Sequence, residues 1–304
     1  MDYEEALMAR VAWFYYIEGL TQQQISDRLN ITRIRVIRLL DKARQTGMIR
    51  FSLRRGNEKR MELEQALISS FGLKDAFLAP APRTSEETNG NVAEAASMYI
   101  SERLTPSSVI NMGYGDTPSR ILNRLATIAE DPLTCVSLTG GVSYYLPDAQ
   151  SNIFNAKLRL IPAPLLASSR EMAEAFLQES GVQELSRMIS LAQMSVVGIG
   201  SLHEDATIFR TGVLNANDRL YLTMRGAAGD VLCHFIDGEG NLINSPIEER
   251  LISTSMDKLR SLKNVIGVAA GAEKVTAIRA VLRGGILDTL ITDEPTAELV
   301  LGSA

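Results

Sequence analysis

The first fifth of the chain carries two apolar stripes at helical spacing, one after the other. Ile25 and Leu29 lie four positions apart, which places both side chains on one face of a short helix. Thr21 precedes this helix and Gln24 stands three residues later. This is the spacing of a capping box, in which each side chain bonds to the other residue's backbone amide. The pattern therefore predicts a short helix that ends at about Leu29.

A longer stripe follows the turn residues Asn30 and Ile31. Thr32 is the expected N-cap of this second helix, and Gly47 is placed to end it with a left-handed residue. The stripe itself consists of Val36, Leu39, Leu40 and Ala43. Two capped helices joined by so short a turn predict a helix-turn-helix, the motif whose second helix enters the major groove of DNA.

Residues 4–18 are predicted to form a helix before this motif. Leu7, Val11 and Phe14 share the face that is expected to pack on the other two helices. Met8, Ala12 and Trp13 lie toward another side, so the helix is apolar over more than one face. That second side is expected either to join the same core or to touch a partner subunit.

The outward side of the second helix is basic, with Ile34 and Ile37 among the cations. A guanidinium group can pair with the two major-groove acceptors of guanine or can hold a phosphate. Residues 48–53 alternate as a strand and run into two arginines, which predicts a wing. The alternative is an ordinary surface helix with solvated charges. The candidate DNA-binding residues are Thr21, Gln22, Thr32, Arg33, Arg35, Arg38, Lys42, Arg54 and Arg55.

Charge is distributed unevenly along the chain. Residues 19–60 contain eleven Lys or Arg and three acids, a local balance of +8 in a chain whose total is −5. The remaining residues therefore carry −13. A basic end on an acidic body is expected where one domain meets phosphate and the other does not.

Beyond about residue 56 the pattern changes to alternating strands and helices. The expected strands cover 76–79, 108–112, 134–139, 158–162, 194–199, 264–269 and 287–292. The expected helices cover 58–71, 91–104, 117–129, 151–157, 169–178, 182–192, 273–282 and 295–301. Such alternation predicts a parallel sheet covered on both faces, the doubly wound, Rossmann-like α/β class. We expect two domains in the 304-residue chain, a DNA-binding domain over 1–55 and an effector-binding and oligomerisation domain over 56–304.

Four of the expected strands run into glycine-rich segments: GYGDT (113–117), TGG (139–141), GIGS (198–201) and AAGAEK (269–274). Glycine lets the backbone approach a ligand, and free amides at a following helix start bind anions. Ligands of doubly wound sheets lie at the carboxyl ends of the strands, so four such segments predict a binding site there. The alternative for each is a tight turn. None is a nucleotide fingerprint, because GYGDT lacks the third glycine of G-x-G-x-x-G.

Several other kinds of protein are disfavoured. Cys135 and Cys233 are isolated, which argues against a disulfide framework or a thiolate metal site. His203 and His234 are the two histidines and are interpreted as ordinary surface or packing residues. The acidic start MDYEEALMAR is unlike a signal peptide, and no apolar run reaches the ~18 residues of a membrane span. We expect a cytoplasmic protein without cofactor or metal.

An ordered set of motifs carries a family resemblance over essentially the whole chain. The run from Ala9 to Arg50, followed by GYGDT, SLTGG, IPAPLLASS, VVGIG, RGAAGD and AAGAEK, resembles the SorC family of sugar-responsive transcription regulators. The resemblance implies a winged helix-turn-helix joined to an effector domain similar to sugar-phosphate isomerases and aminosugar-phosphate deaminases, assembled as a dimer of dimers. It also implies an effector site formed by Gly113, Gly115, Asp116, Thr117, Thr139, Gly140, Gly141, Asp230 and Lys274.

Two classes of function follow from this reading. The first is a regulator of a carbohydrate uptake or catabolism operon, a repressor by family precedent, that binds operator DNA and is controlled by a sugar or sugar phosphate. The second is a sugar-phosphate isomerase or deaminase with an appended DNA-binding domain. An enzyme of that kind needs an acid and a base across a carbonyl carbon. The candidate carboxylates are Asp116, Asp230, Asp293 and Glu294.

Overall fold

The computed structural model of the chain describes residues 3–49, 57–106, 108–129, 131–145 and 155–302. It divides into two compact units, Met1–Glu58 and Lys59–Ala304. The division falls in the first turn of helix α4 (Asn57–Phe71). Each unit has its own hydrophobic core.

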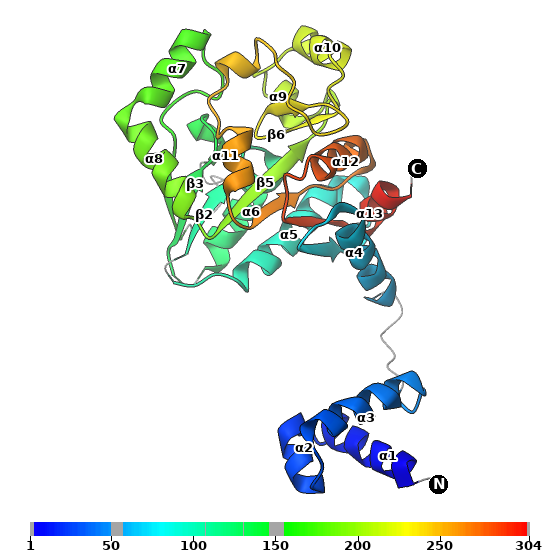
Figure 1. The fold of residues 1–304 in the computed structure, drawn as a ribbon. Helices are drawn as coiled ribbons and strands as arrows, with labels where there is room; N and C mark the ends of the chain where they lie inside the picture. Colours follow the sequence, from blue (N-terminus) through cyan, green and yellow to red (C-terminus); the bar gives the residue numbers. More distant parts are fainter. Residues whose placement is uncertain (1–2, 50–56, 107, 130, 146–154, 303–304) are drawn as a thin grey trace. The chain divides into compact units, whose positions relative to one another are not determined.

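Among the described residues before α4, three helices surround a small core (Figure 1). They are α1 (Tyr3–Tyr16), α2 (Gln22–Leu29) and α3 (Arg33–Gln45). The predicted helix-turn-helix is therefore confirmed. Val11, Ile25, Val36 and Ala43 are completely buried at its centre. Met8 and Ala12 join the same core, whereas Trp13 is 57% exposed. The buried stripe of α1 is broad because this helix packs on both α2 and α3.

The predicted caps are also formed. The Gln24 amide donates to Thr21 Oγ1 at 3.3 Å, and the Thr21 amide donates to Gln24 Oε1 at 2.9 Å. Thr32 Oγ1 accepts from the Arg35 amide at 3.3 Å, and Gly47 has a φ of +71°. The expected strand over 48–53 is wrong at Met48 and Ile49, which lie in an irregular bend because the Ile49 amide donates back to the Ala43 carbonyl oxygen of α3 at 3.2 Å. The rest of the predicted wing, including Arg54 and Arg55, lies outside the described residues.

Seven parallel strands form the sheet of the C-terminal unit in the part of the chain that the structure describes. Their order is β1-β9-β8-β5-β2-β3-β4, and the antiparallel pair β6 and β7 extends from β5. The bounds are β1 (Asp75–Ala79), β2 (Val109–Met112), β3 (Leu133–Ser137), β4 (Ala156–Arg159), β5 (Met194–Gly200), β6 (Gly229–Val231), β7 (His234–Ile236), β8 (Val265–Val268) and β9 (Thr289–Asp293). The predicted doubly wound α/β fold is confirmed.

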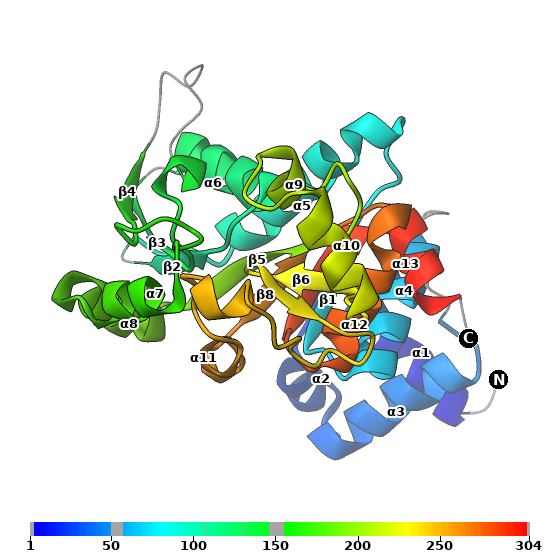
Figure 2. The ribbon, with the colours of Figure 1, turned by 90° about the horizontal axis from the view of Figure 1, so that it is seen from above.

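Helices cover both faces of this sheet (Figure 2). One face packs on α5 (Thr88–Ser101) and α6 (Asp116–Ile128). The other packs on α4, α8 (Ser180–Leu191), α11 (Met256–Ser261), α12 (Val275–Arg283) and α13 (Glu294–Leu301). The remaining helices are α7 (Arg170–Gln178), α9 (Thr207–Arg210), α10 (Ala216–Met224) and short 3-10 turns at Ser85–Glu87, Val142–Tyr145, Glu248–Arg250 and Ala272–Lys274.

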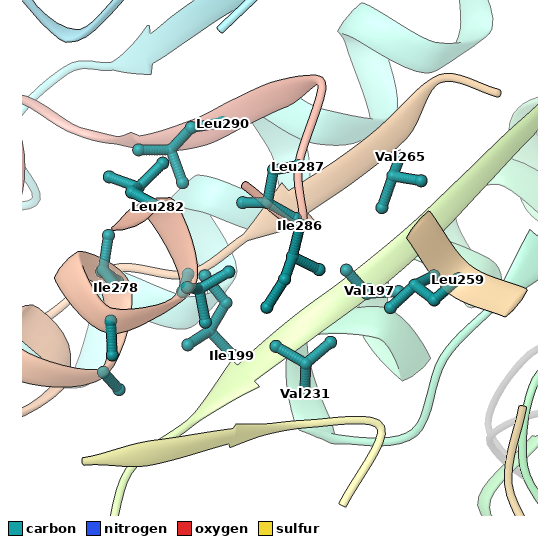
Figure 3. Packing of buried hydrophobic residues seen from close by; sticks show 14 of the residues in the cluster. Val197, Ile199, Val231, Leu259, Val265, Ile278, Leu282, Ile286, Leu287 and Leu290 are labelled. Carbon is teal, nitrogen blue, oxygen red and sulfur yellow. The ribbon is translucent and has the colours of Figure 1, made fainter. Parts of the chain in front are cut away.

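The second face holds the larger core. Val197 and Ile199 of β5 pack with Val231 of β6 and with Ile278 and Leu282 of α12 (Figure 3). Strands β5, β8 and β9 are therefore buried on both faces, as parallel strands usually are.

A sequence-based element of the C-terminal unit is also wrong in part. A helix was expected near 151–157, but Ala156 and Lys157 begin strand β4, with Leu133 of β3 opposite Ala156. Residues 151–154 of that expected helix lie outside the described residues. The strand is set by pairing with a segment more than twenty residues away, which a local apolar count does not detect.

We expect a fragment from Asn57 to Ala304 to fold by itself and to have no affinity for DNA. Its core is separate from that of the N-terminal unit, and Leu67 of α4 is completely buried within it. Thermal and urea unfolding should show one cooperative transition. Within the fragment, Leu67→Ala should lower the free energy of unfolding by about 2–5 kcal/mol. An insoluble fragment, or no effect of Leu67→Ala, would contradict this division of the chain.

Candidate functional site

Strands β2 and β5 are neighbours at the point where the chain changes direction across the sheet. From β2 the chain proceeds outward through β3 to β4, and from β5 it proceeds the other way through β8 to β9. The loops that leave the carboxyl ends of β2 and β5 consequently diverge. In doubly wound sheets this divergence opens a crevice in which ligands bind.

A cavity of about 500 Å³ lies at this switch point. That volume is in the range typical of small-molecule sites. Loops after β2, β5 and β8 contribute to it, together with β6 and α9. The sequence-predicted residues and the GIGS segment that line it are Gly115, Asp116, Thr117, Gly198, Ile199, Gly200, Ser201, Asp230 and Lys274.

The loop after β2 presents the start of α6 to the cavity. Gly115 has a φ of +126°, a conformation that favours glycine, and it turns the chain from β2 into the helix. No side chain caps the first turn of α6, so its leading amides lack a protein acceptor from a cap. Thr117 is the second residue of α6, and it is buried and lines the cavity at this helix start. The arrangement suits a negatively charged or hydroxyl-bearing ligand group.

Asp116 is held by two neighbours at the rim of the cavity. Its Oδ2 accepts from Arg120 Nε at 2.9 Å and from Asn89 Nδ2 at 3.2 Å. The carboxylate therefore positions a guanidinium group at the mouth of the site.

Asp230 is the buried acid of the cavity. Burial raises the pKa of its carboxyl group to about 6, while the Cys233 amide, His234 and Lys274 act in the opposite direction. The Cys233 amide donates to Asp230 Oδ2 at 3.0 Å, and a Cβ at Gly200 would lie 1.9 Å from Asp230 Oδ1. Only glycine at position 200 leaves room for this carboxyl group.

The turn after Asp230 is under backbone strain. Leu232 and Cys233 join β6 to β7 with φ values of +54° and +67°. Residues other than glycine rarely adopt positive φ values, and backbone strain of this kind is often found at functional sites. The strained turn places the Cys233 amide within reach of the Asp230 carboxylate.

Lys274 reaches the cavity from the loop after β8. Burial lowers the pKa of its ammonium group, while Glu273, Asp116 and Asp230 raise it. The Gly271 amide at the start of this loop donates to Thr296 Oγ1 of α13 at 2.8 Å. The position of Lys274 therefore depends on α13.

Four predicted residues do not line this cavity. The Gly113 amide donates to the Val196 carbonyl oxygen at 2.7 Å as part of the sheet. Thr139 bonds to the Tyr145 hydroxyl at 2.7 Å, and the amides of Gly140 and Gly141 donate to the carbonyl oxygens of Ile252 and Ala163. A Cβ at Gly140 would lie 2.2 Å from the Pro164 carbonyl oxygen. The glycines of the TGG segment therefore allow two parts of the chain to pack closely against one another. This matches the alternative of a tight turn and not a ligand-binding segment.

The structure adds lining residues that the sequence pattern did not identify. They include His203, interpreted above as an ordinary histidine, and two arginines, Arg120 and Arg210. His203 Nδ1 lies 3.5 Å from Asp205 Oδ2, and both side chains are well exposed. The segment around 201–215 has no regular apolar period, so no sequence signal placed it beside β2.

The charges around the cavity are mixed. The cationic residues in its lining are Arg120, Arg210 and Lys274, and the acidic residues are Asp116, Asp205, Asp230 and Glu273. Paired donors and acceptors of this kind fit a small ligand that carries several hydroxyl groups, with or without one anionic group. No cluster of His, Cys, Asp and Glu suited to a metal ion occurs in the described residues. Within the same residues, no helix is long and apolar enough to cross a membrane.

The predicted DNA-binding surface lies on α3 in the other unit. Arg33, Arg35 and Arg38 are exposed there, as predicted. Lys42 Nζ lies 2.8 Å from Glu4 Oε1 of α1, so this predicted DNA-binding cation already has a carboxylate partner. Thr21 and Gln22 lie at the start of α2, where Thr21 forms the capping box.

Comparisons with known proteins cover both units. Residues 55–302 match the family model described as "Putative sugar-binding domain", and residues 11–46 match "Sigma-70, region 4". The transcriptional regulator LsrR of Klebsiella pneumoniae is 36% identical over 305 residues, which is 99% of this chain and 94% of that protein. LsrR of Escherichia coli K12 is 34% identical over 304 residues, 99% of this chain and 96% of that protein.

A solved structure also matches over the full length. The full-length sorbitol operon regulator SorC from Klebsiella pneumoniae superposes with a TM-score of 0.70 and 26% identity, over 99% of this chain and 100% of that one. Each of these relatives therefore aligns with this chain across both of its units. The chain belongs to the SorC family of sugar-binding transcriptional regulators.

Proposed function

We propose that this regulator is a cytoplasmic repressor of a carbohydrate uptake or catabolism operon. Its operator affinity falls when a sugar or sugar phosphate binds the switch-point cavity, and its functional form is a dimer of dimers. The observation that carries this proposal is the convergence of Thr117, Asp230 and Lys274 on one cavity, in a chain whose other unit presents an arginine-bearing recognition helix.

Each group in the cavity has a role in the proposed complex. The uncapped start of α6, with Thr117, holds the anionic or most polar end of the ligand. Asp230 accepts from ligand hydroxyl groups, and Lys274 donates to the ligand's oxygens. Effector and operator then oppose one another by linkage, with a coupling of about 1–3 kcal/mol.

The enzymatic alternative needs an acid and a base across one carbonyl carbon. Of the four candidate carboxylates, Asp293 instead caps α13 through the Thr296 amide at 2.9 Å, and Glu294 lies 2.7 Å from Arg60. Asp116 is paired with Arg120. Asp230 is left as the buried acid of the cavity, and one such group is suited to binding hydroxyl groups rather than to paired acid–base chemistry.

We expect DNA upstream of the protein's own operon to be retarded in gel-shift assays and to be released by one member of a panel of free sugars, polyols and sugar phosphates. The same compound should raise the melting temperature and should not be turned over. The compound should lower operator affinity by about 5- to 150-fold, which corresponds to a coupling free energy of about 1–3 kcal/mol. A compound that is converted to product would support the enzymatic alternative, and tighter DNA binding would indicate an activating response.

Thr117→Val and Lys274→Ala should each weaken binding of that compound by roughly tenfold or more, because each removes a hydrogen bond to a polar or charged group. Operator affinity without the compound should stay unchanged. Isothermal titration and gel-shift assays measure the two quantities.

Thr127→Val and Lys263→Ala are the matched controls. Thr127 lies on the exposed side of α6 and donates to the Asn123 carbonyl oxygen, and Lys263 is exposed outside the cavity. Neither should change sugar affinity. Wild-type sugar affinity in the Thr117 and Lys274 variants would refute the assignment of these residues to the site.

Arg35→Ala and Arg38→Ala should weaken specific operator binding, each by about 1–3 kcal/mol if the arginine pairs with a base. Arg54 and Arg55 are proposed to hold phosphates, so their removal should reduce the salt dependence of binding. Arg187→Ala, at an exposed position of α8 in the other unit, serves as the control. Wild-type operator affinity in both α3 variants would contradict the groove-facing assignment of this helix.

A further inference from the structure

Two isoleucines on the recognition helix are exposed. Ile34 exposes 64% of its surface and Ile37 exposes 37%, whereas Val36, Leu39 and Leu40 of the same helix are buried. Isolated exposed apolar residues are common and need no explanation by themselves. The position of Ile34 in the recognition helix distinguishes it from such residues.

Ile34 is the second residue of α3, directly after the cap Thr32 and its neighbour Arg33. Helical spacing places Ile34 and Arg38 one turn apart, on the side opposite Val36 and Ala43. In helix-turn-helix proteins the N-terminal residues of the second helix contact base edges. Ile34 therefore lies at the centre of the surface that faces the groove.

The surface beside Ile34 is hollowed and is favourable for a polyanion. A cavity of about 370 Å³ is lined by Thr32, Ile34, Arg35, Arg38, Lys42 and Glu4, with Leu39 at its floor. Glu4 is the acid in this lining, and its carboxylate is paired with Lys42. The exposed cations on either side of Ile34 complement phosphate, so DNA is the expected occupant.

The side chain of isoleucine has no hydrogen-bond donor or acceptor. Against a polar base edge it would leave that edge's donor or acceptor unsatisfied. The C5-methyl group of thymine is the apolar feature of the major groove. On the basis of the proposed DNA-binding role of α3, we propose that Ile34 selects thymine in the operator by packing on its C5-methyl group.

A second copy of the chain is a less suitable occupant of this surface. A symmetric contact through Ile34 would bring Arg35 and Arg38 of both copies together. Like charges placed against one another in an interface oppose association.

The test uses the full-length protein and deoxyuridine, which lacks only the methyl group of thymine. A bound sequence is first selected from a randomised duplex library. Each thymine is then replaced by deoxyuridine in turn, and affinity is measured by gel shift. At one thymine in each half-site, wild-type affinity should fall about fourfold, which corresponds to about 0.8 kcal/mol for one buried methyl group.

Ile34→Ala should bind the thymine duplex more weakly and should lose the difference between thymine and deoxyuridine at that position. Ile34→Val, a smaller change, should keep part of it. Ile17→Ala is the matched control, because Ile17 has the same 64% exposure and follows α1 rather than lying on α3. It should retain the wild-type response.

Equal affinity for both duplexes at every position would overturn the inference. So would a deoxyuridine effect that persists unchanged in Ile34→Ala. Failure of the selection to enrich any sequence would instead overturn the DNA-binding role of α3, and this inference with it.

Discussion

The divergence of the chain at β2 and β5 is the constraint on which the sugar-binding unit depends. Parallel strands fix all carboxyl ends at one edge of the sheet, and the change of direction between these two strands keeps their loops apart. The cavity therefore arises from strand order, before any particular side chain is considered. Asp116, Thr117, Asp230 and Lys274 then give the cavity its polar and charged lining.

The buried carboxyl group of Asp230 makes this cavity chemically specific. Its burial favours the protonated form, and the Cys233 amide and Lys274 favour the ionised form. Gly200 is required because any Cβ there would collide with the carboxyl oxygen, and the strained turn at Leu232 and Cys233 supplies the amide. The glycine at position 200 and the strained turn therefore both accommodate the Asp230 carboxyl group, which is consistent with a ligand-contacting role for Asp230.

Local rules were sufficient for the elements that local interactions determine. The expected caps form at Thr21 and Thr32, and Gln24 completes the capping box. A cap depends only on residues within the first helical turn, so the sequence pattern alone predicts it. The alternation of strands and helices likewise predicted the sheet. It failed at Ala156 and Lys157, whose strand depends on pairing with β3.

The same limit applies to the site. Glycine after a strand lets another group approach the backbone closely. The sequence does not show whether that group is a ligand or another part of the chain. Gly115 after β2 and Gly198 and Gly200 of β5 line the cavity, whereas Gly140 faces the Pro164 carbonyl oxygen. Arg210 and His203 reach the cavity only because the segment around α9 packs over it, a non-local arrangement without a periodic signal.

Helix α13 joins the cavity to the start of the sugar-binding unit. Its Thr296 accepts from the Gly271 amide of the Lys274 loop, and its Glu294 and Glu298 are paired with Arg60 and Lys59 in the first turns of α4. Helix α4 is the element that continues the chain from the DNA-binding unit. The loop that carries Lys274 and the start of α4 are therefore both held by the same two-turn helix.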